Sequence, residues 1–356
     1  MSSRSFEFLV FIGRFQPLHV GHLAVIHQAL EQAEKVIVLV GSAWQPRSVR
    51  NPWSYSERED MIRASIPVSE SPRVLIAPLM DIPYNDEAWV RNVQATVHGL
   101  VTAHHEQPHR RPRIGLIGHS KDHSSFYLKL FPQWGSVAVD NVGKLSSTPL
   151  REQLFGVAEE GACYGGEWLA TPAAEVLPNP VREQLQGFCA TETFDDVREE
   201  QAFITSYKKG WDKAPYAPTF VTVDAVVVQS GHVLLVERKA RPGQGQLALP
   251  GGFLDPHEKL LDACLRELRE ETRLKVPGPV LKGSIKSQQV FDDPHRSSRG
   301  RTITHAFYME LEPAAELPKV KGGDDARHAL WVPLADLDPV RMFEDHYFII
   351  QEMLGL

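Results

Sequence analysis

Two histidines, His19 and His22, lie where the sequence favours phosphate chemistry. An apolar run over 7–12 precedes them and predicts a buried strand, and a run with helical spacing over 22–33 follows. The unpaired N–H groups and the positive dipole end at a helix start suit an anionic phosphate. Two ordinary turn histidines are the alternative, which the preceding segment Gly13-Arg-Phe-Gln-Pro disfavours.

A second candidate phosphate site opens another predicted helix much further along the chain. The segment Leu145-Ser-Ser-Thr-Pro-Leu-Arg combines hydroxyl groups, helix-start N–H groups and a fixed cation. Pro149 suits the first turn of a helix, where its missing N–H would have no partner. The candidate phosphate ligands are Ser146, Ser147, Thr148 and Arg151. A simply capped helix is the alternative.

Three glutamates in the second half of the chain have the spacing of a metal site. Glu267, Glu270 and Glu271 stand at i, i+3 and i+4, so their carboxylates share one face of a helix. Carboxylates crowded on one face repel one another unless cations neutralise them. Together with a nearby glycine carbonyl and water, they suit Mg²⁺ or Mn²⁺. A solvated acidic face is the alternative.

The elements that must position the two phosphate segments alternate between strand and helix. Strands are predicted over 7–12, 35–41, 73–79, 113–118 and 136–142, and helices over 22–33, 56–65, 86–104, 124–130 and 148–155. This alternation predicts an α/β domain with a doubly wound parallel sheet. Ligands in such sheets bind outside the carboxyl ends of the strands, where both phosphate segments fall.

Further polar residues follow three of these predicted strands. They are Arg47, Arg50 and Arg58 after the second strand, Asn85, Asp86 and Trp89 after the third, and Ser120, Lys121 and Asp122 after the fourth. Arginines among aromatic residues suit a phosphorylated nucleotide, and either Asn85 or Asp86 can cap a helix. The alternatives are solvated loops and, for Trp89, a position in the core.

Length and composition indicate two domains of ordinary composition. The chain has 356 residues, of which 42% are hydrophobic and 23% charged, with a net charge of −7. This length allows two cores, and the negative charge argues against a general nucleic-acid binder. The three cysteines, without metal-type spacing, indicate a reducing cytoplasm. No transmembrane run or cleavable signal is predicted, so no membrane association is expected.

The pattern changes in the second half of the chain. Strands over 219–228 and 232–237 flank Gln-Ser-Gly, which predicts a hairpin, and 259–271 is strongly helical. We expect a first domain over 1–165, a connector over 166–215 and a second domain over 216–356. Because the connector contains several aromatic residues, we expect it to be ordered and to pack on the second domain.

The segment 13–22 resembles the signature of nucleotidylyltransferases, and its Gly-Arg-Phe-Gln-Pro part narrows this to archaeal-type nicotinamide-mononucleotide (NMN) adenylyltransferases. Segment 145–151 is similar to the second half of that signature, with Leu145 where the family has Ile. The resemblance implies in-line attack on the α-phosphate of a nucleoside triphosphate that carries Mg²⁺. The implied catalytic residues are Arg14, His19, His22 and Arg151. The implied nucleotide-binding residues are Gly13, Phe15, Gln16, Gly21, Arg47, Asn85, Trp89, Ser146, Ser147 and Thr148.

The segment 252–274 resembles the Nudix box, Gly-x5-Glu-x7-Arg-Glu-(aliphatic)-x-Glu-Glu-x-Gly-(aliphatic), with Arg273 in place of the last Gly. The implied metal ligands are Gly252, Glu267, Glu270 and Glu271, and Glu258 and Arg266 are the implied supporting pair. Termination of the helix is less favourable with Arg273. The stretch 291–301 is similar to a loop of ADP-ribose pyrophosphatases. Its implied phosphate ligands are Arg296, Arg299 and Arg301, and a solvated loop is the alternative for each of them.

Both sets of motifs together resemble one family, the bifunctional NMN adenylyltransferase/Nudix hydrolases. The resemblance implies a doubly wound nucleotidylyltransferase domain followed by a Nudix α/β/α sandwich with a mixed sheet. It also implies synthesis of NAD from ATP and NMN, and hydrolysis of ADP-ribose to AMP and ribose 5-phosphate. We expect these small-molecule substrates, no nucleic acid and no membrane, and leave a homo-oligomer open.

Two alternatives remain at this stage. The first domain could transfer a nucleotidyl group to another phosphorylated acceptor, against which Trp89 and the Asn-Pro-Trp stretch at 51–53 argue. The Nudix half could be a non-catalytic ligand sensor like those of related transcriptional regulators. The intact glutamates disfavour this, and the sequence ends at Leu356 without room for a following DNA-binding domain.

Overall fold

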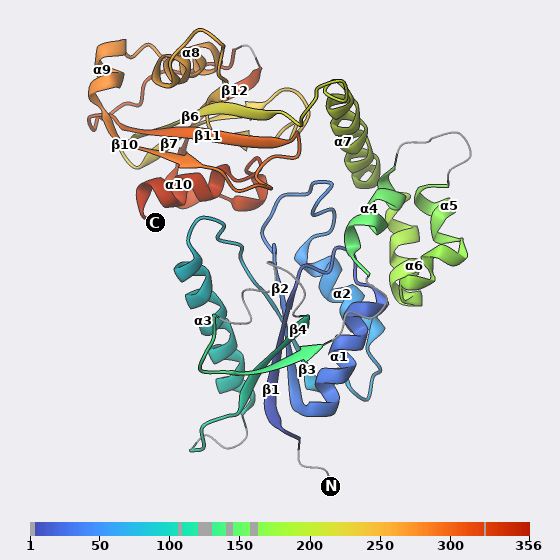
Figure 1. Cartoon of the computed structure of the whole chain (residues 1–356). Coiled ribbons are helices and arrows are strands. Elements are labelled where there is room, and N and C mark those ends of the chain that lie inside the picture. Colours follow the sequence, from blue (N-terminus) through green and yellow to red (C-terminus); the bar gives the residue numbers. More distant parts are fainter. Residues whose placement is uncertain (1–3, 106–108, 120–129, 140–144, 157–162, 324) are drawn as a thin grey trace. The chain divides into compact units, whose positions relative to one another are not determined.

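The computed structural model describes all residues except 1–3, 106–108, 120–129, 140–144, 157–162 and 324. The chain divides into two units, Met1–Gln201 and Ala202–Leu356 (Figure 1), and each is described by itself. The predicted helix over 124–130 lies outside the described residues, as do the end of the fifth predicted strand and Ser120, Lys121 and Asp122. Within the described part, no helix is both long and apolar enough to cross a membrane.

The sheet of the first unit is parallel throughout, with strand order β3-β2-β1-β4-β5. Its strands are β1 (Phe6–Gly13), β2 (Ala33–Val40), β3 (Val74–Pro78), β4 (Ile114–His119) and β5 (Gly135–Val139). The order reverses between β1 and β4, and ligands of such sheets bind beside this switch point. The predicted doubly wound parallel sheet is confirmed.

Helices cover both faces of this sheet. They are α1 (Val20–Gln32), α2 (Tyr55–Ser65), α3 (Asp86–His104) and α4 (Ser147–Phe155), with a 3₁₀ turn at Ser71–Arg73. Figure 1 shows α3 on one side of the strands and α1 and α2 on the other. Alternate residues of β1 explain this, because Leu9 and Phe11 pack with α1 and α2, whereas Phe8 and Val10 pack with α3.

The segment after α4 packs largely on the first unit. It contains α5 (Gly165–Leu169), a 3₁₀ turn (Pro172–Val176), α6 (Asn179–Phe188) and α7 (Glu192–Lys209). Trp168, Leu177, Leu185 and Val197 belong to the same buried cluster as Phe155 of α4. The expectation that this segment packs on the second domain is therefore wrong for these helices. An apolar stripe shows that a helix is buried without showing which core receives it.

The end of the connector does contact the second unit. The rings of Tyr207 and Trp211 lie 6.2 and 5.4 Å from that of Phe220. The division between the two units, after Gln201, accordingly falls within α7.

The second unit contains a mixed sheet between layers of helices. Its strands are β6 (Thr219–Gln229), β7 (His232–Arg238), β8 (Leu247–Ala248), β9 (Gly251–Phe253), β10 (Ile285–Phe291), β11 (Arg301–Glu310) and β12 (Ala326–Pro333). The main order is β10-β11-β6-β7-β12, with β8 paired to β7 and β9 to β6. Strands β6 and β11 are parallel, and the other neighbours are antiparallel. The predicted hairpin joins β6 to β7, with φ of 48° at Ser230 and 74° at Gly231.

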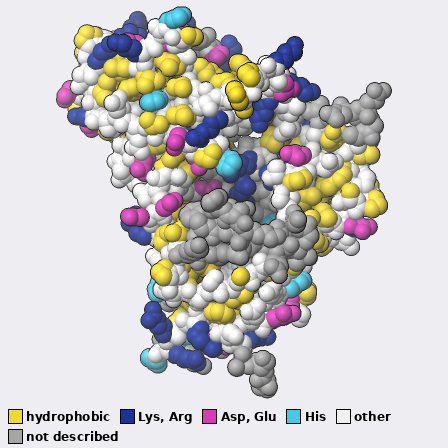
Figure 2. All heavy atoms as spheres, viewed as in Figure 1, with side chains coloured by type: hydrophobic (Ala, Val, Ile, Leu, Met, Phe, Trp, Pro, Cys, Tyr) yellow, Lys and Arg dark blue, Asp and Glu magenta, His cyan; other side chains and the backbone are white. Residues whose placement is uncertain are grey.

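The helices of this unit are α8 (Leu260–Thr272), α9 (Gly278–Gly283) and α10 (His346–Leu354), with 3₁₀ turns at Leu334–Asp336 and Pro339–Arg341. Figure 1 shows α8 and α9 on one side of the sheet and α10 on the other, which confirms the predicted sandwich. Ala263, Cys264 and Leu268 of α8 pack against Val223 and Ala225 of β6. On the face seen in Figure 2, hydrophobic side chains of this unit lie among lysines and arginines.

Helix α8 ends at Arg273, where the Nudix pattern has glycine. Arg273 adopts the left-handed conformation, with φ 51° and ψ 28°, and its N–H donates to the Arg269 carbonyl. The N–H groups of Lys321 and Gly323 donate to the carbonyls of Thr272 and Glu271. The helix end is thus satisfied, and the exposed Arg273 bears the backbone strain that a glycine would avoid.

We predict that Arg273→Gly stabilises the second unit by about 1 kcal/mol, because glycine adopts the left-handed region without steric cost. Hydrogen exchange of the β6 and β11 amides measures the unfolding free energy of this unit separately. Lys275→Gly is the matched control, since this exposed residue is outside the left-handed region and should lose stability. Equal destabilisation by both changes would contradict this account.

Candidate active sites

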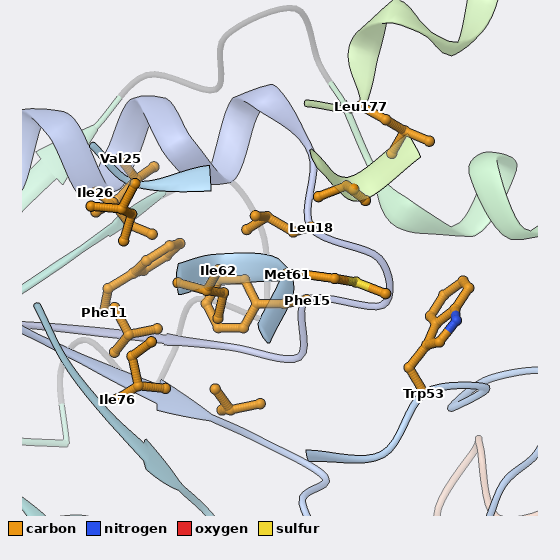
Figure 3. Packing of buried hydrophobic residues seen from close by; sticks show 14 of the residues in the cluster. Phe11, Phe15, Leu18, Val25, Ile26, Trp53, Met61, Ile62, Ile76 and Leu177 are labelled. Carbon is orange, nitrogen blue, oxygen red and sulfur yellow. The ribbon is translucent and has the colours of Figure 1, made fainter. Parts of the chain in front are cut away.

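Phe15 anchors the loop between β1 and α1 in the core of the first unit. Phe15 has a φ of 52° and is buried in the first core (Figure 3). Its ring lies 5.4 Å from that of Phe11 and 4.9 Å from that of His22. A Cβ on Gly13 would lie 2.8 Å from the Phe15 ring, so glycine is required there. Phe15, expected to bind nucleotide, instead supports the loop and the ring of His22.

Gln16 fastens the same loop to the segment after β2. Its amide nitrogen donates to the Trp53 carbonyl at 2.9 Å, and its amide oxygen accepts from the Trp53 N–H at 3.1 Å. Both groups are buried, so these bonds are strong constraints on loop position. The buried Gln16 side chain thus holds the loop through both of its polar atoms.

His19 and His22 meet at the start of α1, as predicted. His19 is the N-cap residue of the helix, and the two rings stack with centroids 3.7 Å apart. The His19 N–H donates to Nδ1 of His22 at 3.3 Å, which places the proton of the neutral His22 ring on Nε2. A Cβ on Gly21 would lie 3.1 Å from the His19 ring. The arrangement presents His22 Nε2 as a hydrogen-bond donor.

The start of α4 is tied to this loop. Arg151 is buried and donates from Nη1 to the Gln16 carbonyl at 2.6 Å and from Nη2 to Thr148 Oγ1 at 3.2 Å. The Ser147 hydroxyl donates to the Pro17 carbonyl at 3.1 Å. Ser146 is the exposed N-cap residue. The two segments that were expected at one edge of the sheet are therefore joined there by hydrogen bonds.

Several arginines lie close to one another at this edge of the sheet. Burial, with the nearby Arg14 and Arg50, lowers the pKa of Arg151 to about 10. Burial and Arg50 also lower the pKa of Arg14, which Asp81 partly offsets. Buried guanidinium groups that repel one another favour a bound anion, which suits a triphosphate.

Two of the arginines after β2 have structural partners. Arg58 is 0% exposed and donates to the carbonyls of Arg14, Gly41, Ser42 and Ser54, and burial lowers its pKa to about 10. It cannot contact a nucleotide, which corrects the expectation. Arg47 donates to the Pro52 carbonyl at 2.7 Å and pairs with Glu57 at 2.9 Å while remaining partly exposed.

Asn85 caps α3, because its side-chain oxygen accepts from the Ala88 N–H at 2.9 Å. This confirms the predicted cap. Trp89 lies partly buried one turn later, with its ring 6.2 Å from that of Phe131. Asp81 was not predicted as a site residue, although it follows β3 at the ligand edge. It accepts from both the N–H and the hydroxyl of Ser42, at 3.1 and 2.5 Å.

In the second unit, Glu267 and Glu271 lie against the Gly251–Gly252 turn. The Glu271 carboxylate accepts from the Gly251 N–H at 3.0 Å. A Cβ on Gly252 would lie 2.4 Å from Glu267 Oε1, so a side chain there would displace the carboxylate. Burial, with Glu267 and Asp224 nearby, raises the pKa of Glu271 to about 8, against the opposing effect of the Gly251 N–H and Arg238.

Arg266 ties the glutamates of this site together. It donates to both oxygens of Glu258, at 2.6 and 3.1 Å, which confirms the predicted supporting pair. It also donates to Glu267 at 2.8 Å and to Glu270 at 3.0 Å. These acceptors raise the pKa of Arg266 above its usual range. With Glu270 turned towards Arg266, no group of three metal-ligating side chains converges among the described residues.

The donor set nevertheless fits a hard divalent cation. Glu271 is a buried carboxyl group beside a second one, and burial, with Glu267 nearby, raises its pKa, so a cation at this position would favour its ionised form. The Glu270 side chain is about half exposed and lies at i+3 from Glu267 on the same face of α8, so a change of rotamer would turn its carboxylate from Arg266 towards those of Glu267 and Glu271. Such oxygen donors are the ligands that Mg²⁺ and Mn²⁺ prefer.

The three loop arginines have different surroundings. Arg296, with a side chain 3% exposed, donates to both oxygens of Asp345 at 2.9 and 3.0 Å. It therefore holds the loop in place, which corrects the expectation that it faces substrate phosphates. Arg299 lies 5.0 Å above the Phe253 ring, and Arg301 remains partly exposed while bonding to the Asp292 carbonyl.

Sequence patterns did not single out a buried polar cluster beneath this site. Asp224 accepts from the Thr304 hydroxyl at 2.5 Å and lies 4.0 Å from His346 Nε2. Burial raises the pKa of Asp224 and lowers that of His346 to about 3. His346 Nδ1 accepts from the Leu249 N–H at 2.8 Å. A single aspartate inside an apolar strand is the signal that could have found this cluster.

Comparisons with known proteins agree with this division. Residues 10–127 match the cytidylyltransferase-like family model, and residues 218–353 match the NUDIX domain model. A nicotinamide/nicotinic acid mononucleotide adenylyltransferase of Acinetobacter baylyi is 41% identical over 151 residues, 42% of this chain and 76% of its own. An ADP-ribose pyrophosphatase of Methanocaldococcus jannaschii is 32% identical over 139 residues, 39% of this chain and 75% of its own. The fold and sites thus define a nucleotidyltransferase joined to a Nudix hydrolase.

A solved structure is similar over the whole chain. It is a bifunctional NMN adenylyltransferase/ADP-ribose pyrophosphatase from Francisella tularensis, complexed with AMP and a manganese ion. It is 34% identical and has a TM-score of 0.86, covering 98% of this chain and 99% of that chain. The chain belongs to the family of bifunctional NMN adenylyltransferase/ADP-ribose pyrophosphatases. These comparisons support neither the sensor nor the other-acceptor alternative.

We predict a pH-dependent stability difference between the metal-free parent and Glu271→Gln. Because the folded carboxyl has a pKa of about 8 and the unfolded one a value near 4.5, the parent loses stability as pH rises between these values. The variant lacks this loss, so its advantage should grow by up to about 4 kcal/mol across the window. Chemical unfolding at pH 5 and pH 8.5 measures it.

Glu270→Gln is the matched control for this prediction, because its carboxylate is about half exposed. We expect no comparable growth in its stability difference across the same window. Saturating Mg²⁺ should abolish the advantage of Glu271→Gln, since the cation stabilises the ionised parent site. A constant difference between Glu271→Gln and parent at both pH values would contradict the burial argument.

Proposed function

We propose that the first unit transfers the adenylyl group of ATP to NMN, giving NAD and pyrophosphate, and that the second unit hydrolyses ADP-ribose to AMP and ribose 5-phosphate. The observation that carries the first proposal is the Arg151–Gln16 bond, which joins the two phosphate segments at the switch point of the sheet. The second is carried by the Glu267 and Glu271 carboxylates against the Gly251–Gly252 turn.

In the first unit, a phosphate oxygen of NMN attacks the α-phosphorus of ATP in line with the bond to pyrophosphate. The new P–O bond forms as the α–β bridge breaks, and its electron pair leaves on pyrophosphate. Negative charge increases on the transferring oxygens, where we assign His19, His22, Arg14 and Arg151 as donors. The orientation of His22 by the His19 N–H supports its assignment as an Nε2 donor.

We propose that Trp89 and Asn85 contact the nicotinamide ring. Ser146, Ser147, Thr148 and the exposed part of Arg47 would then contact phosphate or ribose. Support comes from the position of these residues at the ends of strands or the starts of helices, where polar groups face the ligand edge. The engagement of the Asn85 oxygen in the α3 cap leaves its amide nitrogen as the group for a ligand carbonyl.

In the second unit, we propose that Glu267, Glu270, Glu271 and the Gly252 carbonyl hold Mg²⁺ or Mn²⁺. When bound, the ion supplies activation of water and neutralisation of the diphosphate. Water adds to one phosphorus, the P–O–P bridge breaks, and a proton passes to the surroundings. Arg266 orients Glu267 and Glu270. We assign Arg299 and Arg301 to the diphosphate, supported by their position in the loop beside Phe253 and by the partial exposure of Arg301. We propose a cytoplasmic location, supported by three unpaired cysteines.

Product analysis of the intact protein tests this proposal. Incubation with ATP and NMN should yield NAD and pyrophosphate, and incubation with ADP-ribose and Mg²⁺ should yield AMP and ribose 5-phosphate. A panel of other phosphorylated acceptors in the first reaction should give much less product. A preference for another acceptor would reject the NMN assignment while leaving the fold of the site intact.

We predict that single substitutions separate the two activities. His22→Ala should lower NAD synthesis by about 10²–10³-fold, the typical effect of losing one preorganised donor, and leave ADP-ribose hydrolysis nearly unchanged. Glu267→Gln should do the reverse, since it removes an anionic ligand at the other site. Steady-state rates of both reactions for both proteins measure this. Parallel loss of both activities in a folded variant would contradict the two-site model.

A further inference from the structure

A series of ring contacts in the second unit has no part in the proposed chemistry. It is formed by Phe203, Tyr207, Trp211, Phe220 and Phe253, which we call the aromatic patch. Phe203 and Tyr207 lie 6.2 Å apart, and Tyr207 lies 6.2 Å from Phe220. Trp211 is 5.4 Å from Phe220, and Phe220 is 5.7 Å from Phe253. The aromatic patch therefore runs from α7 through β6 to β9.

Three rings of the aromatic patch are open to solvent. Phe203 and Phe253 are each 38% exposed, and Trp211 is 44% exposed. Large apolar side chains that contact one another and remain exposed mark a binding surface more often than scattered ones do. The patch is therefore a candidate binding surface.

The register of the strands places one end of the aromatic patch beside the glutamates. Phe253 pairs with Thr222, and Gly252 pairs with Val223. Gly252, whose missing side chain makes room for the Glu267 carboxylate, faces the opposite side of β9 from Phe253, because neighbouring strand residues alternate. Phe220 is two residues before Thr222 on the same face of β6, about 7 Å away. Gly251, whose N–H donates to the Glu271 carboxylate, lies two residues from Phe253 on the same face of β9, about 7 Å away, so a ligand held at Glu271 can extend to the patch.

A cation also borders this end of the patch. The guanidinium carbon of Arg299 lies 5.0 Å above the Phe253 ring. The next residue, Gly300, has a φ of 149°, and a Cβ there would lie 3.3 Å from the Phe220 ring. The arginine loop is therefore seated on Phe220 and Phe253. A π-surface beside a cation and a carboxylate site matches a base joined to phosphates.

We propose that the aromatic patch binds the base of the nucleotide that the second unit hydrolyses, with Phe253 as the stacking residue. Trp211 positions Phe253 indirectly, because Trp211 packs on Phe220 and Phe220 packs on Phe253. This inference rests on the proposed hydrolysis of a nucleoside diphosphate compound. It extends the binding site to Trp211, which precedes the residues 218–353 of the NUDIX match. The end of the connector is then part of the hydrolase site.

A second copy of the chain is a less suitable occupant. The three exposed rings offer roughly 300 Å², given the usual area of an aromatic side chain. A stable dimer needs about 800 Å² from each partner. The adjoining Arg299 and glutamates also provide charges of both signs within a short distance, as a diphosphate with its cation requires.

The test compares ADP-ribose hydrolysis by the intact parent, Phe253→Ala, Phe253→Trp and Trp211→Ala. Loss of one base-stacking contact costs about 1–3 kcal/mol, so Phe253→Ala should raise KM by roughly 5- to 150-fold with kcat nearly unchanged. Phe253→Trp should restore most of the loss, and Trp211→Ala should have a smaller effect in the same direction. Tyr216→Ala is the matched control, because Tyr216 is 85% exposed in the same connector.

Product inhibition separates base binding from general damage. In Phe253→Ala, inhibition by AMP should weaken by the same factor as KM, whereas inhibition by inorganic pyrophosphate, which has no base, should not change. Equal weakening of both inhibitors would overturn the base site, as would unchanged constants in a parent that hydrolyses ADP-ribose. A change in sedimentation of Trp211→Ala without a change in KM would assign the patch to self-association. A parent without turnover would instead reject the proposed function, and this inference with it.

Discussion

The hydrogen bond from Arg151 to the Gln16 carbonyl closes a separation of 135 residues and brings the first site together. Gln16 is in turn bonded through its side chain to Trp53, whose ring packs with Phe155 and Phe188. The start of α4 and the loops after β1 and β2 are therefore one network. Among the described residues, the hydrogen-bond acceptors of Arg151 are the neutral oxygens of Gln16 and Thr148. A buried guanidinium held in this way suits a phosphate ligand, so a chain of net negative charge can still offer a local site for a triphosphate.

The side chains of the second site are acidic rather than basic, and hydrogen bonds within the fold hold them in place as in the first site. Glu267 and Glu270 share Arg266 with Glu258, and Glu271 is held by a backbone N–H in a buried position. One guanidinium is shared by three of these carboxylates, while burial, with Glu267 nearby, raises the pKa of Glu271 to about 8. A bound cation would favour the ionised form of this carboxyl. In each unit, the side chains assigned to the ligand thus carry the charge opposite to that of the ligand.

Much of this arrangement follows from local patterns in the sequence. Apolar runs and helical spacing predicted the strands of the first sheet with helices α1 to α4, and in the second unit the β6–β7 hairpin and α8. The two motifs located His22 and Glu267, because these signals depend on neighbouring residues. Long-range pairing could not be predicted in this way. Arg58 and Arg296 are of the residue type that binds phosphate, yet Arg58 donates to backbone carbonyls and Arg296 donates to Asp345. The connector was assigned to the wrong core for the same reason, since amphipathicity does not name its partner.

The central claim is that the two units hold charges of opposite sign for separate ligands. A Mn²⁺ titration of the intact chain, followed by electron paramagnetic resonance, tests it most directly. Without nucleotide, we predict Mn²⁺ binding that Glu267→Gln with Glu271→Gln abolishes and that Arg151→Ala leaves unchanged. Adding ATP should then introduce bound Mn²⁺ in the glutamate double variant, through the triphosphate at the first site. Mn²⁺ binding without nucleotide that survives the loss of both glutamates would contradict the account.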